Sequence, residues 1–264
     1  MKISKILTPI ISSLVALSVL SITYPASSVE AKSYLSTQRN GVLKVTVPKQ
    51  SAGKQMYLVV EKGRQSYSYR LPKSQNISLP FGSGSYHVSV YKGNGRQFEF
   101  LEEKSVRTNI SSIKQATQQH VLIPGTSEPY VKRILNTQFK GWTKWSSDKK
   151  VRQVHAYVTK NYRYDYALEK RVPDWYQPNY SKLSKTKKGI CYDFASLNAS
   201  LLRAMNVPTR LVMGYPSNTT SYHSWNEVYV NKSWKVVDTT FDLGARVKSP
   251  YKAVNTYKKV SYRF

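Results

Sequence analysis

Short runs in which apolar and polar residues alternate fill the chain from Gly41 to about Arg107. They read GVLKVTV, QMYLVVE, SYSYRL, NISLPF, SYHVSVY and RQFEFLE, and turn-forming clusters such as PKQSAG, GSG and GNG separate them. Alternation with a period of two is typical of strands, and short strands at this spacing favour an antiparallel sandwich. We therefore predict a β-sandwich over residues 32–110, in which His87 is a surface or packing residue.

The pattern changes beyond the predicted sandwich. Residues 111–127 are polar, end in IPGTS and predict a linker. The stretches EPYVKRILNTQF and DKKVRQVHAYVTKNY have helical spacing, and in the second one Val151, Val154, His155 and Val158 fall on one face. His155 is therefore expected in the core rather than in a catalytic site.

A long basic stretch, LEKRVPDWYQPNYSKLSKTKK, covers residues 168–188 and has no periodicity. A loop of this length inside a domain is usually functional or disordered. Because it lies just ahead of Cys191, we interpret it as one wall of a cleft. A solvated charged loop is the alternative.

Cys191 is the only cysteine of the 264-residue chain, and it stands in the stretch GICYDFASLNASLLRAM. Apolar residues at helical spacing follow it until Asn206-Val207-Pro208, so a helix is predicted to begin at or near Cys191. The free N–H groups and the dipole at a helix start favour an anion, and a thiolate is such an anion. The same N–H groups could hold the oxyanion of an acyl intermediate.

Two strand-like stretches, HSWNEVYV and SWKVVD, flank the dipeptide Asn231-Lys232, which suits a tight hairpin turn. With a two-residue turn, His223 and Asp238 share one face of the hairpin as diagonal neighbours, within reach of long side chains. That geometry lets a carboxylate fix an imidazole. A three-residue turn would put the two residues on opposite faces.

The order Cys191, His223, Asp238 resembles that of the transglutaminase-like superfamily, a branch of the papain-like cysteine enzymes. The stretches that carry the resemblance are GICYDFASLNASLLRAMNVPTRLVMGY, HSWNEVYV and WKVVDTTFD, and the likeness covers roughly residues 128–242. It implies an α+β fold class, with an N-terminal antiparallel β-sandwich followed by a transglutaminase-like (papain-like) α+β domain at residues 128–264.

Carried over by motif, Cys191 would be the nucleophile, His223 the base and later the acid, and Asp238 the residue that orients the imidazole. The implied chemistry is acyl transfer at an amide through a thioester. The family includes cross-linking enzymes, peptidases and deamidases, so the choice between an amine and water as acceptor stays open.

Other polar residues near these motifs receive lesser roles. Asp193 is expected to be a structural or capping acid, and Asp242 a loop residue. Tyr164 and Tyr166 are candidates for a second oxyanion donor. We expect no cofactor and no metal, because four scattered histidines and one cysteine do not make a zinc site.

Residues 1–31 predict a cleaved signal peptide. Lys2 and Lys5 precede an apolar stretch, and Val29 and Ala31 stand at the −3 and −1 positions of a cleavage site. An uncleaved N-terminal anchor is the alternative, and no lipid attachment or stable membrane span is expected after cleavage. In an exported chain a single cysteine is an inert buried thiol, part of an intermolecular disulfide, or reactive; the family resemblance favours the last.

The chain carries 41 Lys and Arg against 14 Asp and Glu, a net charge of +27; removal of a segment containing two lysines and one glutamate would leave +26. Such a charge attracts polyanions. Nucleic acid is an improbable partner because no nucleic-acid-binding motif is visible, so anionic cell-wall polymers are expected instead. The sequence thus predicts a secreted or wall-associated thiol enzyme acting on protein or cell-wall peptide. The alternative is a non-catalytic surface protein that binds wall polymer.

Overall fold

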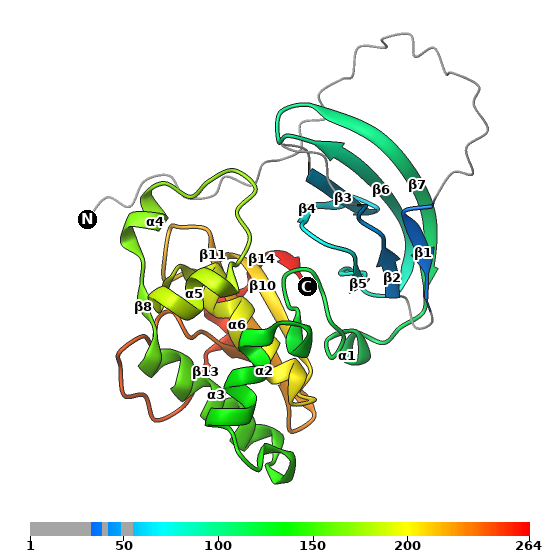
Figure 1. The fold of residues 1–264 in the computed structure, drawn as a ribbon. Helices are drawn as coiled ribbons and strands as arrows, with labels where there is room; N and C mark the ends of the chain where they lie inside the picture. The colour runs from blue at the N-terminus through cyan, green and yellow to red at the C-terminus, as the bar shows by residue number, and fades with distance from the viewer. Residues whose placement is uncertain (1–32, 39–41, 49–54) are drawn as a thin grey trace, which may run out of the picture.

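The computed structural model describes residues 33–38, 42–48 and 55–264, and the predicted signal peptide lies outside them. Figure 1 shows two parts, an N-terminal β part and a mixed α and β part formed by the rest of the chain. No helix of the described residues is long and apolar enough to cross a membrane.

The N-terminal part consists of two antiparallel sheets. The smaller sheet has the order β1 (Leu35–Thr37), β2 (Val42–Val45), β5 (Gln75–Ser78). The larger has the order β4 (Gln65–Leu71), β3 (Gln55–Lys62), β6 (Gly84–Gly93), β7 (Phe98–Thr108). Leu43 and Val45 of the smaller sheet and Leu58, Val60 and Val88 of the larger are buried in one cluster. The predicted β-sandwich is confirmed, since alternate residues of both sheets form its core.

The segment predicted to be a linker is folded, and part of it is buried. It contains α1 (Ser112–Gln115), a bridge between His120 and Ile123, and the 3₁₀ turn η2 (Gly125–Ser127). Leu122 and Ile123 are at most 1% exposed and belong to the sandwich core cluster. The apolar pair inside a polar stretch therefore ties the segment to the sandwich.

The second part is built around a five-stranded antiparallel sheet. Its order is β13 (Tyr251–Lys252), β12 (Ser233–Val237), β11 (His223–Val230), β10 (Thr209–Tyr215), β14 (Lys259–Arg263). The main helices are α2 (Pro129–Gln138), α3 (Ser147–Asn161) and α6 (Cys191–Ala204). Shorter elements are η3 (Trp142–Lys144), β8 (Arg163–Tyr164), α4 (Tyr166–Lys170), α5 (Tyr180–Thr186), β9 (Lys188–Gly189) and η4 (Val254–Tyr257). The α+β fold class is as predicted.

The prediction that residues 168–188 lack regular structure is wrong for part of that stretch. Helix α4 runs to Lys170, and α5 begins after Asn179, whose side chain caps the helix by accepting a hydrogen bond from the Lys182 N–H (2.9 Å). Asparagine is a favoured N-cap because its oxygen satisfies one of the free N–H groups at the helix start. An irregular segment, residues 171–179, remains between the two helices.

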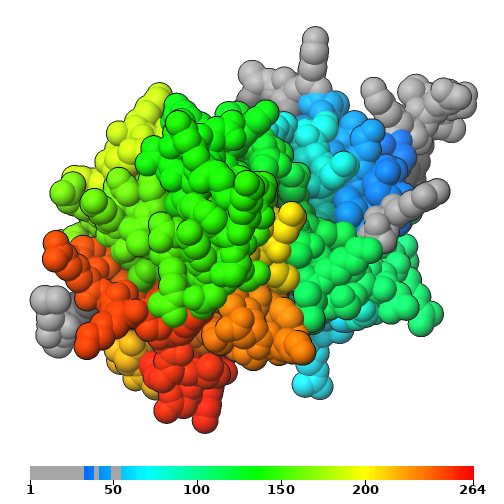
Figure 2. Space-filling view, turned by 90° about the horizontal axis from the view of Figure 1, so that it is seen from below, coloured from blue at the N-terminus to red at the C-terminus, as the bar shows by residue number. Residues whose placement is uncertain are grey.

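Helix α6 lies at the junction of the two parts and is buried along nearly its whole length. One face packs on α2 and α3, and another, with Tyr192, Ala195 and Ala199, belongs to the core cluster of the sandwich. The hydroxyl groups of Tyr67 in the sandwich and Tyr192 lie 3.5 Å apart. The space-filling view shows the two parts in contact (Figure 2). A buried helix so enclosed holds its first residue, Cys191, in a fixed place.

Candidate active site

Cys191 is the first residue of α6, and polar contacts hold the chain around it. The Ile190 N–H donates to the Asp193 carboxylate (2.8 Å), and the Tyr176 hydroxyl donates to the same carboxylate (2.8 Å). A side chain at Gly189 would begin 2.8 Å from the Asp193 Cβ, so only glycine allows this close approach. The predicted capping role of Asp193 is confirmed. Burial raises the pKa of Asp193, while these hydrogen bonds oppose the rise.

The predicted hairpin register is confirmed. Val230 pairs with Ser233, and the two turn residues, Asn231 and Lys232, have φ of 54° and 61°. Both values fit the tight turn that follows the twist of the strands. The last paired residue of β12 is Val237, so Asp238 comes directly after the strand.

His223 and Asp238 meet as the register predicts. The His223 Nε2–H donates to Asp238 Oδ2 at 2.8 Å. Asp238 is fully buried; its Oδ2 also accepts from the Tyr257 hydroxyl (3.0 Å), and its Oδ1 accepts from the N–H groups of Thr240 (3.0 Å) and Phe241 (3.3 Å). Four donors fix this carboxylate, so it in turn fixes the orientation of the imidazole.

The environment of His223 favours its protonated form. Burial would lower the pKa of His223, but the charge of Asp238, the hydrogen bond to Asp238, and a hydrogen bond and charge interaction with Cys191 raise it to about 10. The rings of Phe241 and Trp225 lie 4.8 and 6.3 Å from the imidazole, centre to centre. Cys191 and His223 are 6% and 7% exposed, so the thiol and the imidazole share a site with little water. A charge pair gains strength in such surroundings.

The two tyrosines proposed as oxyanion donors have different surroundings. Burial, followed by the charge of Cys191, raises the pKa of Tyr164, which places Tyr164 beside the thiol. Its hydroxyl donates to Glu169 at 2.9 Å. Tyr166 is 68% exposed and packs against the Tyr164 ring. Neither contact aims a free hydroxyl at Cys191, so the second oxyanion donor is not assigned to them.

Three residues of this site were not predicted from the sequence: Tyr176, Phe241 and Tyr257. Tyr176 belongs to the stretch interpreted as a cleft wall, and its contact with Asp193 agrees with that interpretation. Phe241 follows the WKVVD motif closely, so proximity to Asp238 was the available signal. Tyr257 lies in η4, 19 residues beyond Asp238, and no pattern in the sequence points to it.

A second buried pair joins His155 of α3 to Asp242. The His155 Nε2–H donates to Asp242 Oδ2 at 2.8 Å, and the Lys252 ammonium donates to Oδ1. His155 is a core residue, as predicted. Asp242 lies in the loop after β12, as predicted, but it is only 4% exposed. Burial would raise the pKa of Asp242, but the hydrogen bonds from His155 and Lys252 hold it below its ordinary value.

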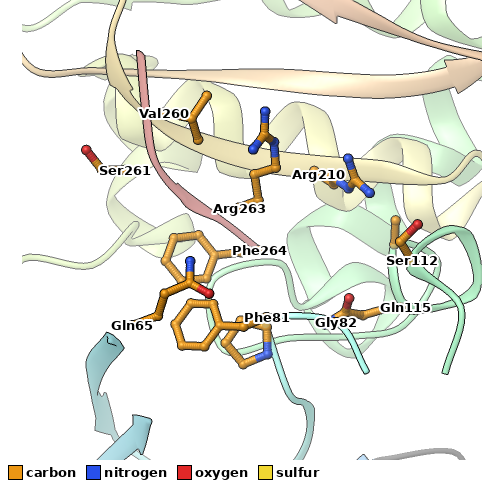
Figure 3. A pocket seen from close by; sticks show the side chains of 12 residues that line it. Gln65, Phe81, Gly82, Ser112, Gln115, Arg210, Val260, Ser261, Arg263 and Phe264 are labelled. Carbon is orange, nitrogen blue, oxygen red and sulfur yellow. The ribbon is translucent and has the colours of Figure 1, made fainter. Parts of the chain in front are cut away.

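The cavity in Figure 3, of about 320 Å³, is separate from the candidate active site. It lies between the sandwich and β14, with Phe81 and Gln65 on one side and Arg210 and Arg263 on the other, and Cys191 does not line it. Among the described residues there is no group of three or more His, Cys, Asp or Glu side chains that could hold a metal ion.

Comparison with known proteins agrees with the motifs of this site. Residues 135–239, which include Cys191, His223 and Asp238, match the transglutaminase-like superfamily. This part of the chain belongs to that superfamily. A curated relative, the UPF0252 protein MJ1282 of Methanocaldococcus jannaschii, is 26% identical over 144 residues, 51% of this chain; the match spans only 40% of that protein's own length.

Three solved structures resemble the transglutaminase-like protein at low identity. They are a TGase (20% identity, TM-score 0.34, 46% of this chain and 32% of the other), a candidate cysteine protease from Cytophaga hutchinsonii (13%, 0.41, 84% and 82%) and the transglutaminase of red sea bream (12%, 0.26, 75% and 47%). At these TM-scores the likeness carries no argument about mechanism.

Proposed function

We propose that this transglutaminase-like protein is a cysteine enzyme that transfers or hydrolyses acyl groups at amide bonds of protein or cell-wall peptide. Cys191, His223 and Asp238 are its catalytic residues in this proposal. The observation that supports it best is the position of His223, which is bound to the buried Asp238 on one side and contacts the only thiol of the chain on the other. Nucleophile, base and orienting group are the three parts that such catalysis requires.

The first half of the reaction forms a thioester. The Cys191 thiolate attacks the carbonyl carbon of the amide, and the carbonyl π electrons move onto oxygen. The N–H groups at the start of α6 are suited to stabilise this oxyanion. When the oxyanion collapses, the C–N bond breaks and the His223 imidazolium gives its proton to the departing amine. The acyl group remains on sulfur.

The second half regenerates the thiol site. The now neutral His223 takes a proton from a water molecule or an incoming amine, which attacks the thioester carbonyl. Collapse of the second oxyanion breaks the C–S bond and leaves the thiolate and the imidazolium as they were. Asp238 accepts the ring N–H throughout and takes no proton, so its contribution is orientation and charge.

The raised pKa of His223, about 10, favours the charged imidazole at neutral pH. A neighbouring imidazolium is one of the groups that make a cysteine more nucleophilic. The low exposure of both side chains favours transfer to an amine, because water competes less well where it is excluded. Hydrolysis and transfer are therefore to be measured together.

A direct experiment offers the protein a peptide library that contains glutamine, with and without an excess of a primary amine. Mass spectrometry of the products distinguishes amine incorporation, deamidation and backbone cleavage. We expect products with the native protein and none with Cys191→Ala. Absence of all three products with both proteins, on protein substrates and on purified wall peptide, would favour the non-catalytic surface protein instead.

We further propose that the protein is secreted and held at the cell wall by anionic polymer. The charge of +27 over the full chain supports this localisation. Attraction between exposed charges weakens as the Debye length falls from about 10 Å at 0.1 M salt to about 3 Å at 1 M. The protein should wash off purified walls at 1 M salt without detergent. Retention until detergent is added would instead indicate an uncleaved N-terminal anchor.

A further inference from the structure

A second cavity, of about 240 Å³, lies between the sandwich and segment 171–179 of the transglutaminase-like domain. Neither the family resemblance nor the proposed catalytic site accounts for it. Its walls come from β3, β4, the β6–β7 turn and the irregular segment. The lining residues are Gln55, Tyr57, Arg70, Asn94, Gly95, Arg96, Asp174 and Trp175.

Two arginines in this cavity have no acidic partner among the described residues. Neither Arg70 nor Arg96 forms an ion pair there, and Asp174 of segment 171–179, which also lines the cavity, is exposed and has no ion pair with a described residue. The lining therefore carries a net charge of +1, from two arginines and one aspartate. The arginines of the cavity in Figure 3 differ, because Arg210 and Arg263 both bind the Glu227 carboxylate at 3.0–3.1 Å.

Neutral donors add to the two guanidinium groups. Gly95 has φ of +92°, and a Cβ built there would lie 3.6 Å from the Tyr57 hydroxyl and 3.8 Å from the Trp175 Nε1. Because glycine has no side chain, both donors stay open toward the cavity. Burial raises the pKa of Tyr57, although the charge of Arg70 opposes the rise, so the hydroxyl keeps its proton at neutral pH. The tyrosine hydroxyl and the tryptophan indole N–H normally have a hydrogen-bond partner when they are buried.

The backbone of Trp175 is unusual. Its φ is +59°, a region that bulky residues rarely occupy. Its ring packs edge-on against Tyr57, with 4.9 Å between centroids, and lies 5.8 Å from Phe98. Strained backbone of this kind persists where surrounding contacts hold it, and it clusters at binding sites. The next residue, Tyr176, donates to Asp193 in the first turn of α6, so the same segment contacts both the cavity and the helix that begins at Cys191.

We propose that this cavity binds a phosphate group. Guanidinium groups recognise oxyanions by paired N–H donors. Donors from four different segments surround the space, which suits a tetrahedral group with several acceptor oxygens better than a planar carboxylate with two. The phosphate can belong to a phosphodiester polymer or be free in solution. Binding requires no step at Cys191, so the proposal stands or falls separately from the catalytic one.

The test is isothermal titration of the full chain with inorganic phosphate and, separately, with a glycerol-phosphate oligomer, both at constant ionic strength. Saturable binding is expected, and Arg70→Gln and Arg96→Gln should each weaken it by about tenfold, the cost of losing one charge-assisted contact. Asp174→Asn should tighten it severalfold, since it removes a nearby negative charge. Arg64→Gln, in the exposed turn after β3, is the matched control and should change the affinity less than twofold.

The comparison of ligands and variants decides the proposal. Tighter binding of the oligomer assigns the cavity to a polymer, and equal affinity per phosphate assigns it to the free anion. Arg96 is exposed, so Arg96→Gln remains decisive if Arg70→Gln fails to fold. Equal weakening by Arg64→Gln and Arg96→Gln would mean that only diffuse positive charge acts, and would overturn the proposal. Absence of saturable binding of both phosphate and the oligomer would overturn it too.

Discussion

The transglutaminase-like domain contains two buried histidine–aspartate pairs, His223 with Asp238 and His155 with Asp242. Each is joined by a 2.8 Å hydrogen bond from Nε2 to a carboxylate. The two pairs differ in the third group that contacts each of them. His223 contacts the only thiol of the chain, whereas the partner of the second pair is the Lys252 ammonium, which binds Asp242. A buried pair does not by itself indicate a catalytic site, and the thiol beside the imidazole is the feature that supports the catalytic proposal for His223 and Asp238.

The second pair is linked to the first through the chain between the two aspartates. Asp238 and Asp242 are the two ends of one five-residue segment, and its middle supplies the Thr240 and Phe241 N–H groups that bind Asp238. His155 anchors the far end of that segment to α3. We therefore expect the first pair to act in chemistry and the second to act in stability.

The largest effect should come from Cys191→Ala. This variant should lose all amide turnover, because no other thiol can form the acyl-enzyme, while its circular dichroism spectrum and melting temperature stay close to those of the native protein. Turnover is measured by product mass, and full activity in this variant would make the mechanism wrong.

The next largest effects should come from the other two residues of the proposed catalytic site. His223→Ala should lower kcat/KM by about a thousandfold or more, nearly as much as Cys191→Ala, because nucleophile and base act as a unit. Asp238→Ala should cost somewhat less, since it orients and stabilises without reacting. Steady-state kinetics check the order, and an Asp238→Ala variant with native kcat/KM would remove that residue from the site.

His155→Gln should change kcat/KM by less than about threefold but should clearly lower the free energy of unfolding. Loss of a buried hydrogen bond to a charged group costs about 1–3 kcal/mol in the free energy of unfolding. Denaturant unfolding gives the stability, and kcat/KM is measured on the folded fraction. Should His155→Gln abolish turnover in fully folded protein, the division between the two pairs would be lost.

The pH dependence of stability should differ in direction for the two pairs. The pKa of His223 is raised from 6.5 to about 10, so its contribution is fully present below about pH 6.5, declines above that pH and is gone beyond about pH 10. The pKa of Asp242 is lowered from 3.8, so its contribution is present above about pH 4 and is lost in more acidic solution. Melting temperatures from pH 2.5 to 10.5 measure both.

Matched variants show which residue causes the alkaline loss of stability and which causes the acid loss. His223→Gln should flatten the alkaline decline alone, and Asp242→Asn should flatten part of the acid decline alone. If Asp242→Asn instead removed the alkaline decline, the two pairs would be coupled and could not be treated as separate.

The parts of the molecule that follow from local pattern were predictable. The turn residues Asn231 and Lys232 fix the register of the hairpin, and the register alone brings His223 to Asp238. The apolar spacing after Cys191 likewise predicts α6. In both cases one short stretch of sequence contains the whole cause.

Contacts between distant segments were not predictable. His155 and Asp242 are separated by 87 residues, and their meeting depends on how α3 packs against the sheet. Tyr257 reaches Asp238 only because the chain between β13 and β14, which form opposite edges of the sheet, crosses the sheet and packs the Tyr257 ring against Trp225. Leu122 and Ile123 are buried against residues of the sandwich far from them in the sequence, and their polar neighbours along the chain gave no sign of this burial.

Activation of Cys191 by His223 can be measured as the rate of Cys191 alkylation by iodoacetamide as a function of pH. Native protein and His223→Ala are compared, with the alkylated site confirmed by mass spectrometry. We expect rapid alkylation of the native protein at pH 6 and at least about tenfold slower alkylation of His223→Ala there, because an imidazolium favours the thiolate. Equal rates for both proteins across the whole pH range would contradict it.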